Sequence, residues 1–490
     1  PPLVLPRVAG LPAPWGPAAR PPRPRPPRPV DFPSYDLRTL PNGLQVLVVP
    51  HHEQPSVSFR LIVTAGSVNE APARFGVASF VAALLTQGTT TRSSGEIATL
   101  IDSAGGLINA GSANELSFVA GAVLKDRTVQ ALELAADLVR NPAFAPEEIE
   151  RHRRQAMSAM QVGYDDPDYV AGVVFNRLVF GGHPYGRPGD GTPESVARVT
   201  RDDLVAFHRT WFVPNNALLA IVGDLSADEA FAAAERAFGS WPMRDVPEIT
   251  LPALPAAARR IVVVDRPGSA QTEIRVGHLA IARTSPDFVP FDLAVRILGG
   301  EGANRLFGVL RSDRGLTYGA SAAFRTYRGG GQVVAETDTR TETTGESLRL
   351  MVDEFWRLQR EAVRFPELRG AQDYLAGSFP LTIETPAAIA TQVLAYIFYG
   401  LDPKEIESYR DKVEAVTPED IQRVAKQIMR PDRLSIVLVG DASRFVDQLK
   451  ALGFEEFDLI PIAELDVASP TLRRGAASGR EAPGEGLPPA

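Results

Sequence analysis

Cysteine is absent from this sequence of 490 residues. Its absence excludes disulfide bonds and thiolate metal sites, and it leaves the redox compartment open. No run reaches the roughly 20 consecutive apolar residues that a membrane-spanning helix needs, so we predict no transmembrane segment. The formal net charge of −8 argues against a nucleic-acid partner or an anionic membrane surface.

The sequence also lacks a starting methionine, since its first residue is Pro1. Together with the high content of alanine, arginine and proline, this leads us to expect a removed leader and a periplasmic or otherwise exported protein. Two motifs of other enzyme classes are missing as well. There is no G-x-S-x-G nucleophile elbow and no phosphate-binding loop, which argues against an independent hydrolase of an unrelated kind.

The composition is that of a globular protein, with 44% hydrophobic and 22% charged residues. The length exceeds what one core supports, so two or more domains are expected. Alternating helical and strand patterns predict an α+β protein with layered domains. We predict a Pro/Arg-rich arm at 1–34, a first domain at 35–240, a linker at 241–260, a second domain at 261–465 and a flexible tail at 466–490. The arm is either a flexible segment or a segment that lies on a partner.

An internal repeat supports two homologous domains. Thr200 and Thr417 begin similar helical patterns, and Gly223 and Gly440 end similar apolar strands. Both pairs are separated by 217 positions. Because helix, loop and buried strand recur at equal spacing, the two halves are predicted to share one fold.

One stretch in the second half is suited to contact a ligand. A predicted helix, 304–311, turns at Gly315 into a predicted strand, 316–322, and Arg311 and Tyr318 flank the turn. A guanidinium offers a planar fork of donors and a phenol offers one more, so the pair could hold a peptide carbonyl. From the residues alone, Arg311 could equally cap the helix and Tyr318 could be an ordinary strand aromatic.

Several motifs together carry a family resemblance over most of 35–460. They are PNGLQVLV, GSVNE, GVASFVAALLTQGT, NPAFAPEEIERHR, HPYGRP, two VGD strands and LRSDRGLTYGA. With them the chain resembles the insulinase/pitrilysin family of inverted zinc peptidases, especially its two-domain, processing-peptidase-like branch. The resemblance implies two related peptidase-like α/β sandwich domains that form half of a clam shell, which a second subunit closes.

The family's zinc motif is lost from this chain. That motif is H-x-x-E-H on one helix, with the glutamate as general base, and a distant glutamate completes the site. Here Ser79, Ala82 and Ala83 occupy the three motif positions, and Ala159 is the position matched to the distant glutamate. No two of the six histidines have helical ligand spacing with an acidic partner, so we expect no metal site in this chain.

The resemblance implies roles for several other residues. In the family, an arginine and a tyrosine seven positions apart bind substrate near the scissile bond, and Arg311 and Tyr318 match them. The edge strand containing Asn109 would accept an extended peptide by strand addition. Gly299, Gly300 and Gly302 would let the backbone approach the substrate, although a tight helix-to-loop turn explains these glycines equally well.

Two functions remain in competition. In the first, the chain is the non-zinc subunit of a heterodimeric metallopeptidase and supplies Arg311 and Tyr318 to a homologous zinc-bearing partner that hydrolyses peptides. In the second, it is a catalytically inactive structural subunit of a larger assembly, like peptidase-derived core proteins. The retained pair favours the first function, whereas the Pro/Arg-rich arm is explained more easily by the second.

Overall fold

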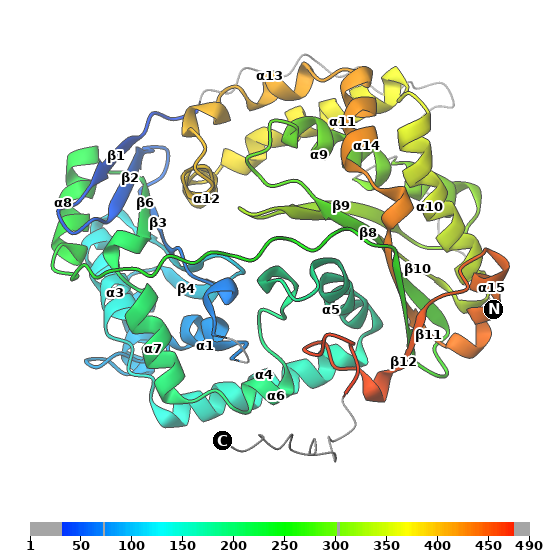
Figure 1. Cartoon of the computed structure of the whole chain (residues 1–490). Helices are drawn as coiled ribbons and strands as arrows, with labels where there is room; N and C mark the ends of the chain where they lie inside the picture. Colours follow the sequence, from blue (N-terminus) through cyan, green and yellow to red (C-terminus); the bar gives the residue numbers. More distant parts are fainter. Residues whose placement is uncertain (1–31, 72–73, 301–303, 475–490) are drawn as a thin grey trace, which may run out of the picture.

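The computed structural model describes residues 32–71, 74–300 and 304–474 and contains two six-stranded sheets (Figure 1). The strands of the first sheet are β1 (Asp36–Thr39), β2 (Gln45–Pro50), β3 (Ser56–Val63), β4 (Leu107–Ser112), β5 (Ser117–Leu124) and β6 (Ala217–Gly223). Those of the second sheet are β7 (Arg260–Asp265), β8 (Gln271–Ala280), β9 (Ala320–Thr326), β10 (Gly331–Arg340), β11 (Ser435–Gly440) and β12 (Asp458–Pro461).

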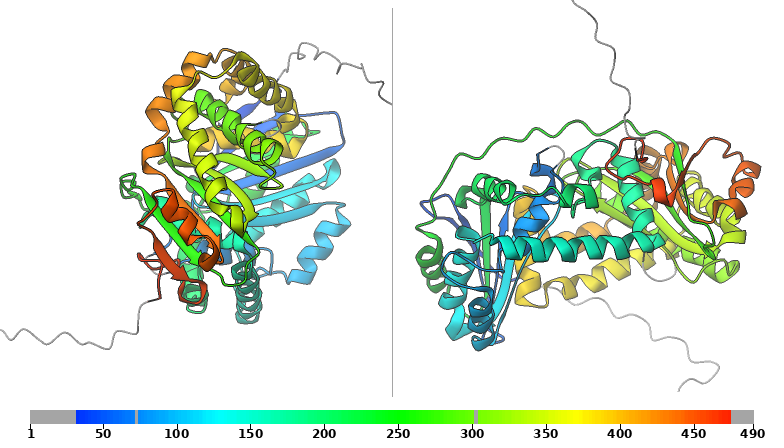
Figure 2. Two further views of the ribbon diagram at one scale, coloured as in Figure 1. Left: turned by 90° about the vertical axis from the view of Figure 1, so that its right-hand side faces the viewer. Right: turned by 90° about the horizontal axis from the view of Figure 1, so that it is seen from below.

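Helices cover both sheets, and α5 (Pro167–Phe180) and α12 (Pro386–Phe398) lie between them (Figures 1 and 2). The first half contains α1 (Val77–Leu84), α2 (Ser94–Ser103), α3 (Thr128–Arg140), α4 (Pro146–Asp165), α5 (Pro167–Phe180), α6 (Pro193–Val196), α7 (Arg201–Trp211) and α8 (Ala227–Phe238). The second half contains α9 (Phe288–Gly299), α10 (Thr344–Arg360), α11 (Phe365–Ser378), α12 (Pro386–Phe398), α13 (Tyr409–Glu414), α14 (Pro418–Ile428) and α15 (Val446–Ala451).

The predicted repeat is confirmed by the sheet topology. The strand orders are β1-β2-β6-β3-β5-β4 and β12-β7-β11-β8-β10-β9, which correspond at five of six positions. Thr200 and Thr417 are the N-caps of α7 and α14, and each accepts a hydrogen bond from the backbone of the aspartate three residues later. Such capping satisfies N–H groups that a helix start leaves unpaired. The two halves therefore use the same local chemistry at equivalent places.

Each half of the chain contributes one helix that packs on the sheet of the other half. The apolar side chains of α5, which belongs to the first half of the chain, pack against β7, β10 and β11 of the second sheet. In return, α12 from the second half packs against β2, β3 and β6 of the first sheet. Each sheet consequently has one face covered by its own helices and the other covered by a helix from the opposite half. This exchange makes the two domains one structural unit.

The segment between α8 and β7 contains no helix or strand and runs across the outside of both domains (Figure 1). Leu251 and Leu254 in this segment are partly buried against the core formed by α5 and the second sheet. Before β1, Phe32 and Tyr35 pack against the core of α12. The remainder of the predicted arm, 1–31, lies outside the described residues.

The C-terminal tail begins later than the sequence predicts. The sequence predicts a start at residue 466, but Val467 and Leu472 are buried in the core that contains α5. The high content of small and polar residues after Leu465 concealed these two apolar anchors. Residues 475–490 lie outside the described part of the chain.

Within the described ranges, no single helix has the length and apolar character to cross a membrane. The consecutive helices at Phe365–Ile383 and Pro386–Phe398 reach that length only when taken together, across a bend of 111°. The second of these is α12, whose buried residues contact the first sheet.

Candidate functional site

The loop that carries Arg311 and Tyr318 differs from its predicted form. The helix is a π-helix, Phe307–Asp313, and the strand β9 begins only at Ala320. The predicted strand start at 316 is therefore wrong, and 316–319 form an irregular loop after Gly315, whose φ is 62°. Glycine tolerates this left-handed backbone without the steric cost of a side chain.

Arg311, on the π-helix, and Tyr318, on the loop after it, lie close together. The guanidinium carbon of Arg311 is 5.5 Å from the centroid of the Tyr318 ring, within the range of a cation–π contact. Both side chains are exposed, and Tyr318 has 86% of its surface accessible. The Arg311 guanidinium makes no hydrogen bond or ion pair with another described residue in the structure. The donors of both residues thus remain available for a ligand.

A buried ion pair attaches the start of the π-helix to α11. Arg305 Nε lies 3.0 Å from Glu367 Oε1, and the side chain of Arg305 is only 6% exposed. Burial alone would raise the pKa of Glu367, but hydrogen bonds from Arg305 and from the Arg364 backbone outweigh it and lower this pKa. The carboxylate therefore stays charged, and it fixes the helix that carries Arg311.

Packing accounts for two of the three glycines that precede this helix. A side chain on Gly299 would place its Cβ 2.3 Å from the backbone nitrogen of Ala322, because α9 closely approaches β9 there. A Cβ on Gly300 would lie 2.8 Å from Arg296 Cα. Close packing at the end of α9, where the helix turns into the loop, therefore explains Gly299 and Gly300 without a substrate. Gly302 lies outside the described residues.

The positions of the lost zinc motif lie on α1. Ser79 donates a hydrogen bond from Oγ to Asp190 Oδ1 at 2.9 Å, and Ala82 is completely buried. Together with Ala83, these residues offer no imidazole and no carboxylate. Their side chains therefore do not fit a zinc ion at this helix.

The helix α4 faces α1 with a different set of residues. The ring of His152 packs edge-on against Phe80 of α1, with centroids 4.5 Å apart. Burial, assisted by the charge of Arg151, lowers the pKa of His152. Ala159 is exposed, whereas Met160 is buried in the same core as α1. Neither an alanine nor a thioether replaces the distant carboxylate ligand. Across the described residues, no group of three or more His, Asp or Glu could hold a metal ion.

A buried glutamate, which sequence reasoning left without a role, accepts hydrogen bonds from the start of α1. Glu70 Oε1 accepts hydrogen bonds from the backbone N–H groups of Gly76 (3.1 Å) and Ala78 (2.8 Å). Burial raises the pKa of Glu70 to about 8, although these hydrogen bonds act in the opposite direction. The GSVNE motif, in which this residue follows a predicted strand, was the available signal. Glu70 thus holds the helix that carries the lost motif.

Asn109 lies on β4, which is the last strand in the order of the first sheet. Its side chain is exposed, and its register partner on β5 is Ala120. The neighbouring Leu107 is 57% exposed. The position of β4 at the sheet edge is what strand addition by a peptide requires.

The buried carboxylate of Glu115 links the two domains through hydrogen bonds. Glu115 accepts hydrogen bonds from the Tyr185 hydroxyl (2.7 Å) and from the backbone N–H of Arg328 (3.1 Å). The Tyr185 hydroxyl in turn accepts one from the backbone N–H of Gly329 (3.0 Å). Burial raises the pKa values of both Glu115 and Tyr185. This network joins the first domain to the turn between β9 and β10.

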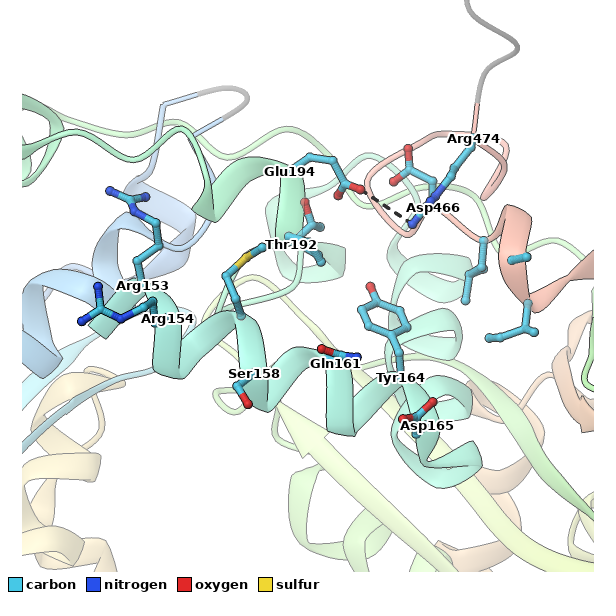
Figure 3. A pocket seen from close by; sticks show the side chains of 15 residues that line it. Arg153, Arg154, Ser158, Gln161, Tyr164, Asp165, Thr192, Glu194, Asp466 and Arg474 are labelled. Atoms are coloured by element: carbon cyan, nitrogen blue, oxygen red, sulfur yellow. Dashed lines mark ion pairs between the residues drawn. The ribbon is translucent and has the colours of Figure 1, made fainter. Parts of the chain in front are cut away.

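A cavity of about 900 Å³ lies between α4, α6 and the C-terminal segment (Figure 3). Tyr164 points into it, and an ion pair of 3.8 Å between Glu194 and Arg474 crosses one side. None of the predicted site residues lines this cavity. The cavity is therefore separate from the loop of Arg311 and Tyr318.

Two stretches of the chain match models of known protein families. Residues 45–185 match the family described as "Insulinase (Peptidase family M16)", and 198–375 match "Peptidase M16 inactive domain". The two matches together span more than half of the chain. The chain belongs to the M16 family. The resemblance found in the sequence is thereby confirmed, and with it the two-domain α/β fold.

Relatives in this M16 family include proteins named as zinc proteases. An uncharacterised zinc protease of Mycobacterium leprae is 27% identical over 411 residues, covering 83% of this chain and 92% of that protein. The crystal structure of a peptidase M16 inactive domain from Pseudomonas fluorescens has 28% identity and a TM-score of 0.79, covering 83% and 98% of the two chains.

A protease from Helicobacter pylori has a similar fold, with a TM-score of 0.79 at 20% identity, over 84% of this chain and 100% of that one. The present chain is thus a peptidase-like member of the family whose α1 lacks the zinc-binding residues.

Proposed function

We propose that this chain is the non-zinc subunit of a heterodimeric metallopeptidase. It supplies Arg311 and Tyr318 to a homologous partner that carries the zinc ion and the general base, and the assembled pair hydrolyses peptides. The observation that carries the proposal is the placement of the two side chains. The guanidinium carbon of Arg311, on the π-helix, lies 5.5 Å from the centroid of the Tyr318 ring, on the loop that follows. Both side chains are exposed, while α1 of the same chain has no metal ligands.

The chemistry of peptide hydrolysis explains why such a pair is useful. Attack on a peptide carbonyl places negative charge on its oxygen, and hydrogen-bond donors aimed at that oxygen lower the barrier. A guanidinium and a phenol hydroxyl are donors of this kind. Because Tyr318 has few contacts in its own chain, the substrate and the partner would supply the missing surroundings. The exposed edge of β4 would bind the peptide as an additional strand, with Asn109 beside it.

The decisive experiment is purification of this protein from its native source, with mass spectrometry and zinc analysis of the proteins that accompany it. We expect a homologous subunit containing H-x-x-E-H, one zinc ion per heterodimer, and peptidase activity only in the complex. Recovery in a large assembly without any zinc peptidase would refute the proposal. That result would instead support a structural subunit, which is the competing function and the one that better explains the Pro/Arg-rich arm.

A periplasmic or otherwise exported location is part of the proposal. Fractionation of native cells, with immunodetection of the chain beside marker proteins of each compartment, tests it. Recovery with cytoplasmic markers would contradict this location and leave the proposed chemistry unchanged.

A further inference from the structure

We propose that Thr337 and Thr339 of β10 are positioning residues for Tyr318. This inference rests on the proposed function, since it concerns how the chain holds a group that would contact the substrate. It starts from the exposure of Tyr318. A side chain with 86% of its surface accessible is not held by packing. Its contact with the Arg311 guanidinium is worth about 0.5–1 kcal/mol at an exposed site. The backbone must therefore fix its direction.

The backbone beside Tyr318 is held by the hydroxyl groups of β10. Thr339 Oγ1 donates a hydrogen bond to the carbonyl oxygen of Leu316 at 2.9 Å. Thr337 Oγ1 donates to the carbonyl oxygen of Gly319 at 2.8 Å. These two carbonyls lie on either side of Tyr318 in the sequence. The peptide units 316–317 and 319–320, each one unit removed from Tyr318, are thus tied to β10. The Gly319 carbonyl also accepts a hydrogen bond from Thr317 Oγ1 at 2.8 Å.

The spacing of the two threonines suits this task. Alternate residues of a strand point to the same face, so Thr337 and Thr339 present their hydroxyls side by side. Both are buried, with 4% and 1% of their surfaces exposed. A buried hydroxyl without a hydrogen-bond partner is costly, so each hydroxyl is expected to stay bonded. Besides the loop carbonyl, Thr337 Oγ1 lies 3.2 Å from the carbonyl oxygen of Asp338, and Thr339 Oγ1 lies 2.9 Å from Thr343 Oγ1. Behind them, Ser347 of α10 donates a hydrogen bond to Thr339 Oγ1 at 3.1 Å.

The loop itself adds one more hydroxyl. Thr317 Oγ1 accepts a hydrogen bond from the backbone N–H of Gly319 at 3.0 Å, which closes a tight turn around Tyr318. The backbone N–H of Leu316 is bonded to the Leu310 carbonyl at 2.9 Å. The loop therefore obtains from threonine side chains and the preceding helix the hydrogen bonds that a regular strand would obtain from its neighbour.

Thr337→Val and Thr339→Val remove the two hydroxyls with little change in shape, and Thr341→Val is the matched control. Thr341 is also fully buried, and its hydroxyl donates to the carbonyl of Ser269, away from the loop of Tyr318. In the assembled peptidase we expect each test variant to lower kcat about tenfold, since small misplacements of a reacting group are costly. KM and assembly with the partner should change less than twofold, and Thr→Ser at the same positions should restore kcat.

A double-mutant cycle separates positioning from general stability. If the threonines act through Tyr318, then Thr337→Val and Thr339→Val should have almost no effect on kcat in a Tyr318→Phe background. An equal loss of kcat in both backgrounds, an equal loss in the Thr341→Val control, or no recovery with serine would overturn the inference.

Hydrogen exchange on the isolated chain gives a second readout that needs no partner. Backbone amides in a peptide spanning 314–320 should exchange at least tenfold faster in both test variants, but not in the control. Unchanged exchange would overturn the positioning role whatever the activity. If Tyr318→Phe left the activity of the native complex intact while exchange responded as expected, the proposed function would fail and the structural support of the loop would stand.

Discussion

The ring of Tyr185 stacks on the ring of Tyr327, with centroids 4.4 Å apart and an angle of 24° between the planes. Tyr185 belongs to the 3-10 turn Pro184–Gly186 of the first half, and Tyr327 directly follows β9 of the second. The same Tyr185 carries the hydroxyl that bonds Glu115 and the Gly329 N–H. One aromatic side chain thus combines the apolar and polar contacts between the domains at this place.

Tyr185→Phe should destabilise the protein while leaving this stacking in place. The change removes one donor to Glu115 and one acceptor for Gly329, and buried groups left unpaired cost about 1–3 kcal/mol each. Urea denaturation should show a lower free energy of unfolding for this variant. Tyr374→Phe, at a position 43% exposed, is the control and should stay within about 0.5 kcal/mol of the wild type. Equal stability of the two variants would show that the hydroxyl network contributes little.

Arg311→Lys should lower turnover of the proposed heterodimer even though the charge is kept. An ammonium lacks the planar fork with which a guanidinium can bind a carbonyl oxygen, and it reaches less far over the Tyr318 ring. Removal of one oxyanion donor costs about 10²–10³-fold in kcat in comparable sites. Arg311→Ala and Tyr318→Phe should therefore lower kcat by an amount approaching that range. The kcat of Arg311→Lys should lie between those of these two variants and that of the wild type. Steady-state kinetics on the native complex measures this. Arg314→Lys, at an exposed neighbour on the same loop, is the control.

Glu70→Gln should flatten the dependence of stability on pH. The folded protein raises the pKa of this carboxyl from 4.5 to about 8, so the folded state retains the proton over a range where the unfolded chain has lost it. Its contribution to stability is therefore present below about pH 4.5 and is lost as the pH rises to about 8. Glutamine keeps an oxygen for the N–H groups of Gly76 and Ala78 but does not titrate. Free energies of unfolding at several pH values, with the exposed Glu53→Gln as control, decide the point.

Breaking the pair of Arg305 and Glu367 should be worse than replacing both partners. Removal of one partner from a buried ion pair leaves a charge without compensation and costs about 3–5 kcal/mol, whereas apolar replacement of both is often close to neutral. The partial exposure of Glu367 places the expected loss at about 3 kcal/mol for Arg305→Met. The double variant Arg305→Met/Glu367→Met should unfold at a higher temperature than Arg305→Met alone. A double variant less stable than the single one would contradict this account.

The two halves, 32–259 and 260–474, should not form stable monomers when produced separately. Alone, the first half exposes the apolar side of α5, and the second half exposes that of α12. We expect each half to aggregate or to lack cooperative thermal unfolding, and the two halves to assemble when produced together. Circular dichroism and gel filtration test this. A monomeric first half with a sharp unfolding transition would show that α5 does not need the second sheet.

The sequence predicts those structural features that depend on contacts between residues close together along the chain. Thr200 and Thr417 are visible as helix caps because a capping side chain acts within three residues, and the strands ending at Gly223 and Gly440 are visible as apolar runs. The pairing of Arg311 with Tyr318 could also be anticipated, since only seven positions separate them. In each case the deciding contacts lie close together along the chain.

Features that depend on distant contacts could not be read from the residues. The apolar pattern of α5 predicts a buried helix but does not indicate which sheet it covers. The loop before β9 resembles a strand in sequence, and its irregular path depends on hydroxyls of Thr337 and Thr339 some twenty positions later. A pair of threonines on alternate positions of β10 was the available signal, but threonine is so common in strands that the pattern indicated nothing more.

Because α5 packs on the sheet of the second half, it is synthesised long before the strands that it covers. The strand β11, at the centre of the sheet that α5 covers, is completed only at Gly440, long after α5 ends at Phe180. At roughly 5–20 residues per second, the apolar face of α5 waits on the order of ten seconds or more for its partner. The nascent first half must be kept from aggregating during that interval. From the order of the helices we therefore expect the first half of the chain to need protection by a chaperone during translation.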